Sequence, residues 1–235
     1  MHLLLKYPPI ILIYLVPVIL ISITFHEVSH AFCSYRLGDP TAKNMGRLTL
    51  NPLKHLDILG TIMILISGFG WAKPVPINPM YYNDRKKGTM LVGLAGPLSN
   101  IMLAFLFSLP MAYLGNKYGN APIEAMFSID QLYIFSSFLP IPVLFNLSRF
   151  FYIININLAV FNILPVPPLD GSRILSGILP QKQYFKIMQY ENYIAVIFLL
   201  LIFIFPGILY KVMFPFIWLL ETSLRFIALP LLKLL

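Results

Sequence analysis

The chain has 235 residues, of which 58% are hydrophobic and only 11% are charged, and its mean hydropathy is +0.79. Soluble domains carry about 25% charged residues, so this chain cannot hide its apolar surface within one water-facing globule. The same counts exclude a disordered chain, a collagen and a disulfide scaffold, the last because Cys33 is the only cysteine. The net charge of +8 is better explained by loop orientation at a lipid bilayer than by nucleic acid, which we do not expect as a partner.

The length and the apolar stretches predict an all-α polytopic membrane protein with about five to six transmembrane helices. The first stretch runs from Pro8 to about Tyr35 and is too long for a signal peptide, so we interpret it as a retained helix. Pro8 and Pro9 suit its first turn, Gly38 suits its end, and Pro17 should bend it. Further apolar stretches follow at about 89–114, 143–164, 187–205 and 208–229. Segment 124–142 is also apolar but contains two prolines, which predicts a short helix near the outer surface.

Positive charge predicts the orientation of the chain in the membrane. Eight of the 17 lysine and arginine residues lie between residues 36 and 87, and the cytoplasmic face collects such residues. The apolar stretch 58–70 separates two basic clusters, yet its roughly 13 residues are fewer than the roughly 20 that a span needs. We therefore expect a re-entrant segment with short β structure after the first helix, the N-terminus outside, and both Lys54 and Lys86 in the cytoplasm. A short interfacial helix is the alternative.

The strongest chemical signal lies inside the first apolar stretch, in the run TFHEVSH at residues 24–30. Four residues advance a helix by about 400°, so His26 and His30 project from one face and can bind one zinc ion. Glu27 is turned about 100° from His26 and can reach a metal-bound water. His26 lies about 15 Å along the helix from the cytoplasmic anchor Arg36, at a depth where unpartnered polar residues cost several kcal/mol. The alternative is a structural polar cluster bonded to neighbouring helices.

Two imidazoles and a water leave a catalytic zinc one protein ligand short. Asp170 is the best candidate, because prolines at 165–168 end regular helix before it and Gly171 frees the backbone after it. An aspartate on broken backbone near the cytoplasmic end of a span can turn inward to a metal, although Asp before Gly is also ordinary turn chemistry facing water. Cys33, one turn beyond His30, is conceivable as a fourth ligand, but we favour a packing role because a catalytic zinc keeps that position open.

These motifs together resemble the site-2 proteases, which are intramembrane zinc metalloproteases. The resemblance is carried by TFHEVSHAF at 24–32, GLAGPLSN at 93–100 and FNILPVPPLDG at 161–171, in that order. The stretches GRLTLNPLKHLDILGT at 46–61 and GFGWAKPVPINP at 68–79 are similar to the small prokaryotic members without a PDZ domain. The three ordered motifs are highly specific, and the resemblance covers roughly residues 20–180.

In that family two histidines and the aspartate of the third motif bind zinc, and the glutamate is the general base. The resemblance therefore implies that His26, His30 and Asp170 bind one Zn²⁺ per chain and that Glu27 is catalytic. The asparagine that opens the third motif is associated with the active site in the family, and it matches Asn162.

We expect the amide of Asn162 to stabilise the oxyanion that forms during hydrolysis. The alternative is that Asn162 bonds a neighbouring helix near Asn100. The re-entrant strand near Gly68–Ile77 is expected to hold a locally unwound substrate by strand pairing.

The resemblance implies a single integral membrane protease domain over residues 1–235, with a catalytic core at about 8–180 and a C-terminal helical pair at about 187–229. We expect a multi-pass protein of the cytoplasmic membrane whose active site lies toward the cytoplasm. Its substrates would be transmembrane proteins, cut in or next to their membrane segments in regulated intramembrane proteolysis. The alternative is a metal- or proton-coupled transporter that uses the same His/Glu/Asp set. Such a transporter is expected to have broken helices in repeated halves, and the sequence shows no internal repeat.

Overall fold

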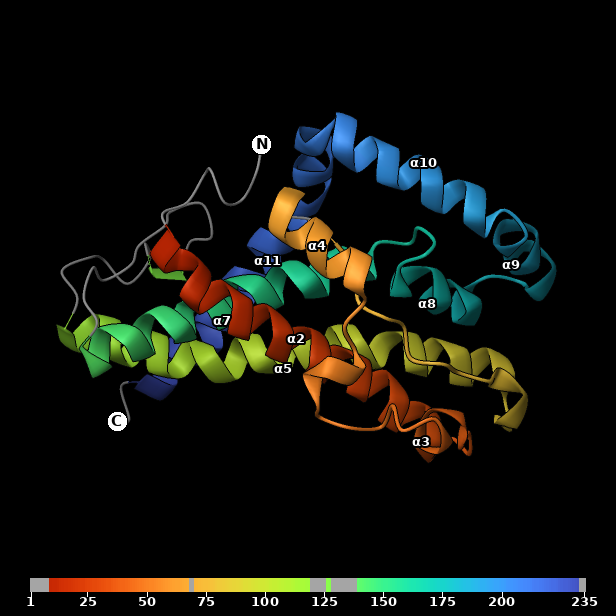
Figure 1. The fold of residues 1–235 in the computed structure, drawn as a ribbon, viewed down its shortest axis with the longest axis horizontal. Helices are drawn as coiled ribbons and strands as arrows, with labels where there is room; N and C mark the ends of the chain where they lie inside the picture. The colour runs from red at the N-terminus through yellow and green to blue at the C-terminus, as the bar shows by residue number, and fades with distance from the viewer. Residues whose placement is uncertain (1–8, 68–69, 119–125, 128–138, 233–235) are drawn as a thin grey trace.

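The computed structural model describes residues 9–67, 70–118, 126–127 and 139–232, which form an all-helical protein (Figure 1). The helices are α2 (Pro9–Arg36), α3 (Thr41–Asn44), η1 (Pro52–Lys54), α4 (Ile58–Ser67), η2 (Pro79–Tyr81), α5 (Arg85–Tyr118), α7 (Pro140–Ile163), α8 (Asp170–Ile178), α9 (Gln181–Met188), α10 (Glu191–Ile204) and α11 (Pro206–Leu232). Four helices, α2, α5, α7 and α11, are long and apolar enough to cross a membrane. A fifth span is formed if α9 and α10, bent by 61°, count as one. Within the described residues the chain is therefore a multi-pass membrane protein with four or five candidate spans, and a sixth is not confirmed.

The predicted apolar stretches correspond to helices, with bounds set by local backbone chemistry. Helix α2 ends at Arg36, and Gly38 follows with a φ of 104°, which confirms the predicted stop, because a residue without Cβ adopts this conformation readily. Helix α2 continues through Pro17 as one element. The predicted helix at 187–205 is broken, because α9 ends at Met188 and α10 begins at Glu191. The helix expected at 124–142 falls mainly on residues outside the described ones, and its last three residues open α7.

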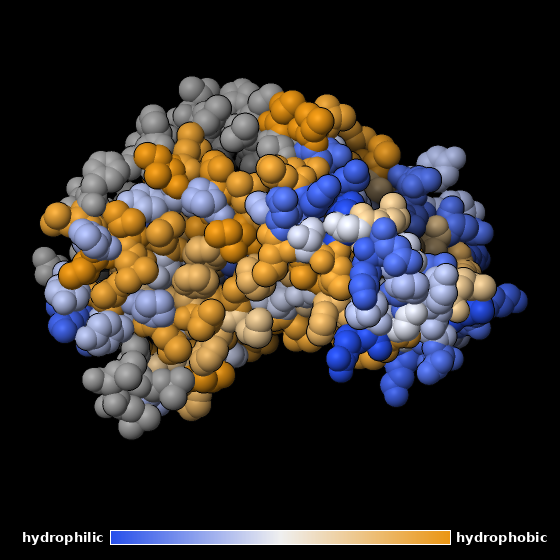
Figure 2. All heavy atoms as spheres, turned by 60° about the horizontal axis from the view of Figure 1, so that its bottom comes forward, coloured by the Kyte–Doolittle hydropathy of each residue, from blue (hydrophilic) through white to orange (hydrophobic). Residues whose placement is uncertain are grey.

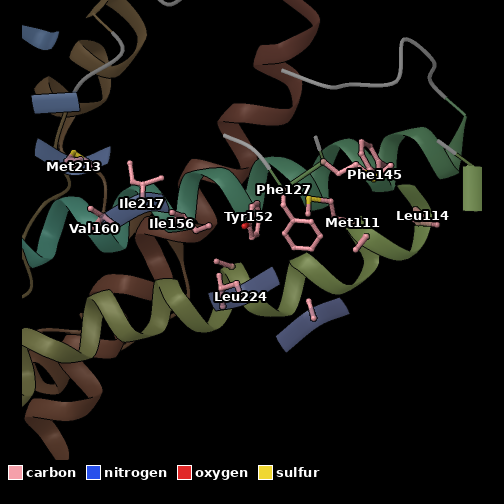
Figure 3. Packing of buried hydrophobic residues seen from close by; sticks show 14 of the residues in the cluster. Met111, Leu114, Phe127, Phe145, Tyr152, Ile156, Val160, Met213, Ile217 and Leu224 are labelled. Carbon is pink, nitrogen blue, oxygen red and sulfur yellow. The ribbon is translucent and has the colours of Figure 1, made fainter. Parts of the chain in front are cut away.

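Helices α2, α5 and α7 lie side by side and form the body of the protein (Figure 1). One apolar cluster fills the space between α5, α7 and α11, and Figure 3 shows Phe127 beside Tyr152 within it, with ring centroids 5.5 Å apart. A second cluster joins α2 to α7, where Tyr14 stacks on Phe150. Helix α5 packs against the same cluster through Phe107, whose ring lies 4.0 Å from that of Phe151. These contacts set the spacing of the three helices that carry the polar site described below.

The region expected to re-enter the membrane contains a helix instead of a strand. Helix α4 has ten residues, about 15 Å in length, and is too short to span a bilayer. Leu56 before α4 and Ala72 after it form an isolated antiparallel bridge. The segments that enter and leave α4 therefore lie side by side. A Cβ on Gly60 would lie 2.0 Å from the carbonyl oxygen of Trp71, which shows how closely the returning chain packs on α4. The described residues contain no β-strand, so the expected β segment is not confirmed.

The buried carboxylate of Asp39 connects the end of α2 to the extended chain that follows α4. It accepts hydrogen bonds from the Ser34 hydroxyl at 2.8 Å, the Thr41 backbone N–H at 2.9 Å and the Asn78 backbone N–H at 2.7 Å. Burial alone raises the pKa of a carboxyl group, but these hydrogen bonds outweigh it and hold the pKa of Asp39 below its ordinary value. The ionised carboxylate thus fixes where the extended chain at 70–78 lies relative to α2.

Figure 2 shows apolar side chains over most of the visible face and hydrophilic side chains gathered at the end where α3 and α9 lie in Figure 1. All of the lysines and arginines between residues 36 and 87 are exposed except Arg47.

Because the chain after α4 pairs with the chain before it, we predict that Lys54 and Lys86 lie on the same side of the membrane. Cysteines at these two positions, in a Cys33→Ser background, should react with an impermeant thiol reagent from the same side. Labelling from opposite sides would mean that residues 58–70 cross the bilayer.

Candidate metal centre

Three buried side chains from two distant parts of the chain converge between the helices. His26 and His30 lie one turn apart on α2, and Asp170 is the first residue of α8. The Nε2 atoms of both histidines lie 3.0 Å from Oδ2 of Asp170 and 3.0 Å from each other. The structure thus brings together the three residues that the sequence predicted as ligands, and it places them in a group that could hold a metal ion.

The backbone around Asp170 explains how a residue beyond α7 reaches α2. Helix α7 ends at Ile163, and a turn of irregular chain leads to the start of α8. Gly171 does not have the positive φ that a freed backbone would show. It is needed for space, because a Cβ there would lie 2.1 Å from the carbonyl oxygen of Leu164 and 2.2 Å from that of Ile163. The glycine therefore lets α8 pack directly on the end of α7, which aims Asp170 inward.

The outer nitrogens of the two imidazoles are held by acceptors. Nδ1 of His30 lies 2.6 Å from the carbonyl oxygen of Val92, and Nδ1 of His26 lies 2.6 Å from Oδ1 of Asn100. A backbone carbonyl only accepts, so His30 donates its Nδ1–H, and its neutral imidazole presents a lone pair at Nε2.

This donor set fits a zinc ion. Ligand nitrogens about 2.0–2.1 Å from a tetrahedral zinc are separated by about 3.3 Å, close to the three observed separations of 3.0 Å. Two histidines and one carboxylate, each with a lone pair directed inward, are also the ligand types of catalytic zinc sites. Cys33 is half-buried one turn further along α2 and does not belong to the group.

Glu27 and Asn162 line the same cavity of about 330 Å³ as the two histidines and Asp170. Oε2 of Glu27 accepts a hydrogen bond from the backbone N–H of Val75 at 3.0 Å. The Asn162 amide donates to the Leu158 carbonyl oxygen at 2.9 Å, one turn back on its own helix. The cavity also receives Arg173, whose Nη1 lies 3.6 Å from Oδ1 of Asp170. A carboxylate, an amide and a cation thus share one cavity with the three candidate ligands.

Helix α5 contributes residues that support the candidate ligands and were not predicted from the sequence. A Cβ on Gly96 would lie 2.4 Å from Nε2 of His30 and 2.6 Å from Nε2 of His26, so α5 approaches the ligand atoms with its bare backbone. Gly93 similarly faces α8, where a Cβ would lie 2.9 Å from that of Arg173. Both glycines and Asn100 belong to the motif GLAGPLSN, for which the sequence suggested only that Asn100 could be a partner of Asn162.

We predict that Gly96→Ala will weaken zinc binding about 10- to 100-fold, because overpacking of this kind costs about 1–3 kcal/mol. The measurement is zinc affinity by competition with a chromophoric chelator. Gly115→Ala on the same helix is the matched control, since its methyl group would meet the flexible end of Met126 away from the ligands. Equal zinc affinity in the Gly96→Ala variant and the unsubstituted protein would contradict the close approach of α5.

Comparisons with known proteins agree with this geometry. The model of peptidase family M50 matches residues 14–205. Relatives of this chain carry the name "Putative zinc metalloprotease". YwhC of Bacillus subtilis is 42% identical over 200 residues, which cover 84% of this chain and 83% of that protein. MJ0611 of Methanocaldococcus jannaschii is 30% identical over 70% of this chain and 71% of its own length. Rip2 of Mycobacterium tuberculosis is 29% identical over 80% of this chain and 65% of its own length. No solved structure shows a significant match to this chain.

The family match extends over most of the chain and includes all three motifs with their ligand-type residues. The metal-binding geometry and the names of the relatives point to the same chemistry. The chain therefore belongs to peptidase family M50, the site-2 protease family of zinc metalloproteases.

Proposed function

We propose that this protein hydrolyses peptide bonds in or next to the transmembrane segments of other membrane proteins. The observation that carries the proposal is the buried group of His26, His30 and Asp170, with Glu27 facing the same cavity between membrane-spanning helices. A transporter, the alternative from the sequence, is not favoured, because the chain belongs to a peptidase family.

The proposed roles follow from the chemistry of each side chain. His26, His30 and Asp170 hold one zinc ion per chain. When bound, zinc polarises carbonyl groups and lowers the pKa of a water ligand toward about 7, which makes a nucleophile available at neutral pH. Glu27 takes the proton of the attacking water and returns it to the leaving amine, since a carboxylate within reach of both can act first as base and then as acid.

Asn162 is proposed to stabilise the oxyanion of the tetrahedral intermediate. Its amide nitrogen carries two hydrogens, and the bond to Leu158 uses one of them. The second can be donated into the cavity that Asn162 shares with Glu27. The alternative partner, Asn100, instead bonds His26 and Asn155.

The extended chain at 70–77 is proposed to receive the unwound substrate. Trp71, Pro74 and Val75 line the cavity, and their segment carries backbone groups that could pair with another extended chain. Pro74 and Pro76 have no backbone N–H. Only the carbonyl oxygens of these two prolines can take part in pairing. A substrate that pairs here would therefore have to direct its own backbone N–H groups toward them.

We further propose that the protein resides in the cytoplasmic membrane with its active site toward the cytoplasm. The support is the set of exposed lysine and arginine residues between residues 36 and 87, because such residues collect on the cytoplasmic side of membranes. His26 lies ten residues before the exposed Arg36 on α2, about 15 Å from that end.

Glu27→Gln should abolish hydrolysis of a membrane-peptide substrate while the purified protein still holds about one zinc per chain, because Glu27 is not a ligand. His26→Ala should lose both zinc and activity. Zinc is measured by elemental analysis, and a chelator should block the hydrolysis by the unsubstituted protein. Equal zinc loss in the two variants would contradict this division of roles.

Asn162→Ala should lower kcat by about 10²-fold or more, the loss expected for one oxyanion donor, with zinc content unchanged. Asn157→Ala is the matched control, because Asn157 lies on the same helix and makes the same bond to the carbonyl oxygen four residues back, at 2.9 Å. An empty zinc site or an unfolded protein in the Asn162→Ala variant would assign Asn162 a structural role instead.

A further inference from the structure

Behind His26 lies a line of buried polar side chains that the proposed mechanism does not use. Asn100 on α5, Asn155 on α7 and Ser22 on α2 each have an exposed fraction of 0%. The Asn100 amide donates to Oδ1 of Asn155 at 2.8 Å, and the Asn155 amide donates to the Ser22 hydroxyl oxygen at 2.8 Å. Together with His26 they connect all three helices of the body through side chains alone.

A backbone carbonyl on α7 fixes the orientation of the Asn155 amide and, through it, that of the Asn100 amide. The Asn155 amide also donates to the carbonyl oxygen of Phe151 at 2.8 Å, one turn back on α7. A carbonyl oxygen can only accept, so the NH₂ group of Asn155 must face Phe151, and its oxygen must face Asn100. That oxygen in turn requires the NH₂ group of Asn100, which leaves the Asn100 oxygen facing Nδ1 of His26.

We propose that Asn155 acts through Asn100 as a positioning residue that sets the tautomer of His26. An oxygen at 2.6 Å from Nδ1 requires a hydrogen on that nitrogen, so the neutral ring carries its lone pair on Nε2. The inference rests on the proposed function, since Nε2 is the atom that would bind zinc. If Asn100 turned over, its NH₂ group would demand a lone pair at Nδ1, and the proton would move to the ligand position.

His30 needs no such line, because the backbone carbonyl of Val92 holds its Nδ1 directly at 2.6 Å. A side-chain amide has no fixed orientation of its own, and its two ends are nearly the same size. The orientation of Asn100 therefore has to be supplied by a group that cannot turn over. Asn155, tied to the Phe151 carbonyl, supplies it.

The test compares zinc affinities, measured by competition with a chromophoric chelator, for two substitutions of Asn155. Asn155→Leu removes the acceptor for Asn100 and should weaken zinc binding about 10- to 100-fold, the usual cost of losing an outer-shell partner. Asn155→Asp retains an acceptor for the Asn100 amide and should bind zinc nearly as the unsubstituted protein does. A purely structural role predicts the reverse order, because leucine is tolerated within a membrane protein far better than a carboxylate.

Asn157→Leu is the matched control, since it removes the same kind of amide from the same helix away from the line, and its zinc affinity should not change. If Asn155→Leu fails to fold, Asn100→Asp and Asn100→Leu repeat the comparison one step nearer His26. The aspartate presents an oxygen to Nδ1 in either orientation and should retain zinc, whereas leucine should lose it. Weaker binding in the aspartate variant than in the leucine variant at either position would overturn the inference.

The same measurements separate this inference from the proposed function. If the unsubstituted protein binds no zinc, or if His26→Ala binds it equally well, the metal assignment itself fails. If zinc binds and is lost in His26→Ala but all substitutions of Asn155 leave its affinity unchanged, only the positioning role is wrong.

Discussion

His26, His30 and Asp170 lie buried inside an apolar body, between α2, α5 and α8. Ionisable side chains at membrane depth cost several kcal/mol without partners, so the surrounding helices have to satisfy every polar atom of the group. The structure does this for the outer nitrogens with a backbone carbonyl at His30 and an amide oxygen at His26, and it leaves the two Nε2 atoms and the Asp170 carboxylate facing one another, where a metal ion would satisfy them. The arrangement of α2, α5 and α7 is thus dictated by the site as much as by the apolar clusters around it.

Close approach of helices is the second requirement, and glycine meets it at two contacts. Gly96 lets the backbone of α5 lie against the imidazole rings, and Gly171 lets α8 lie against the end of α7. A methyl group at either position would lie within 2.7 Å of neighbouring atoms, which no packed interior tolerates without a shift. Helix association without a hydrophobic driving force generally relies on small residues at such contacts. Here the same small residues also bring the ligands together.

Much of the fold and the ligand group could be predicted from the sequence, because both follow from local patterns. Apolar runs predicted the long helices, and the four-residue spacing of His26 and His30 predicted one shared face. The part that could not be predicted depends on contacts between distant segments. The bend between α9 and α10 and the line from His26 through Asn100 to Asn155 arise from packing that no single stretch encodes, whereas the short helix α4 agrees in length with the alternative stated for residues 58–70. Asn100 belongs to the motif GLAGPLSN, but no pattern in the sequence pointed to its partner Asn155.

Glu27, the proposed general base, and the extended chain beside it are held as one unit. Val75 donates to Glu27, the backbone N–H of Lys73 donates to the His55 carbonyl oxygen at 2.9 Å, and Asn78 donates to Asp39. Arg47 donates to the carbonyl oxygen of Lys73 at 2.6 Å. The segment is therefore held by four hydrogen bonds at three of its residues, and one of these bonds is to Glu27. A substrate backbone that pairs with this segment would lie at a set distance from Glu27, whatever its side chains are. Positioning by the backbone accounts for how a protease could act on different apolar sequences, because main-chain groups are common to all of them.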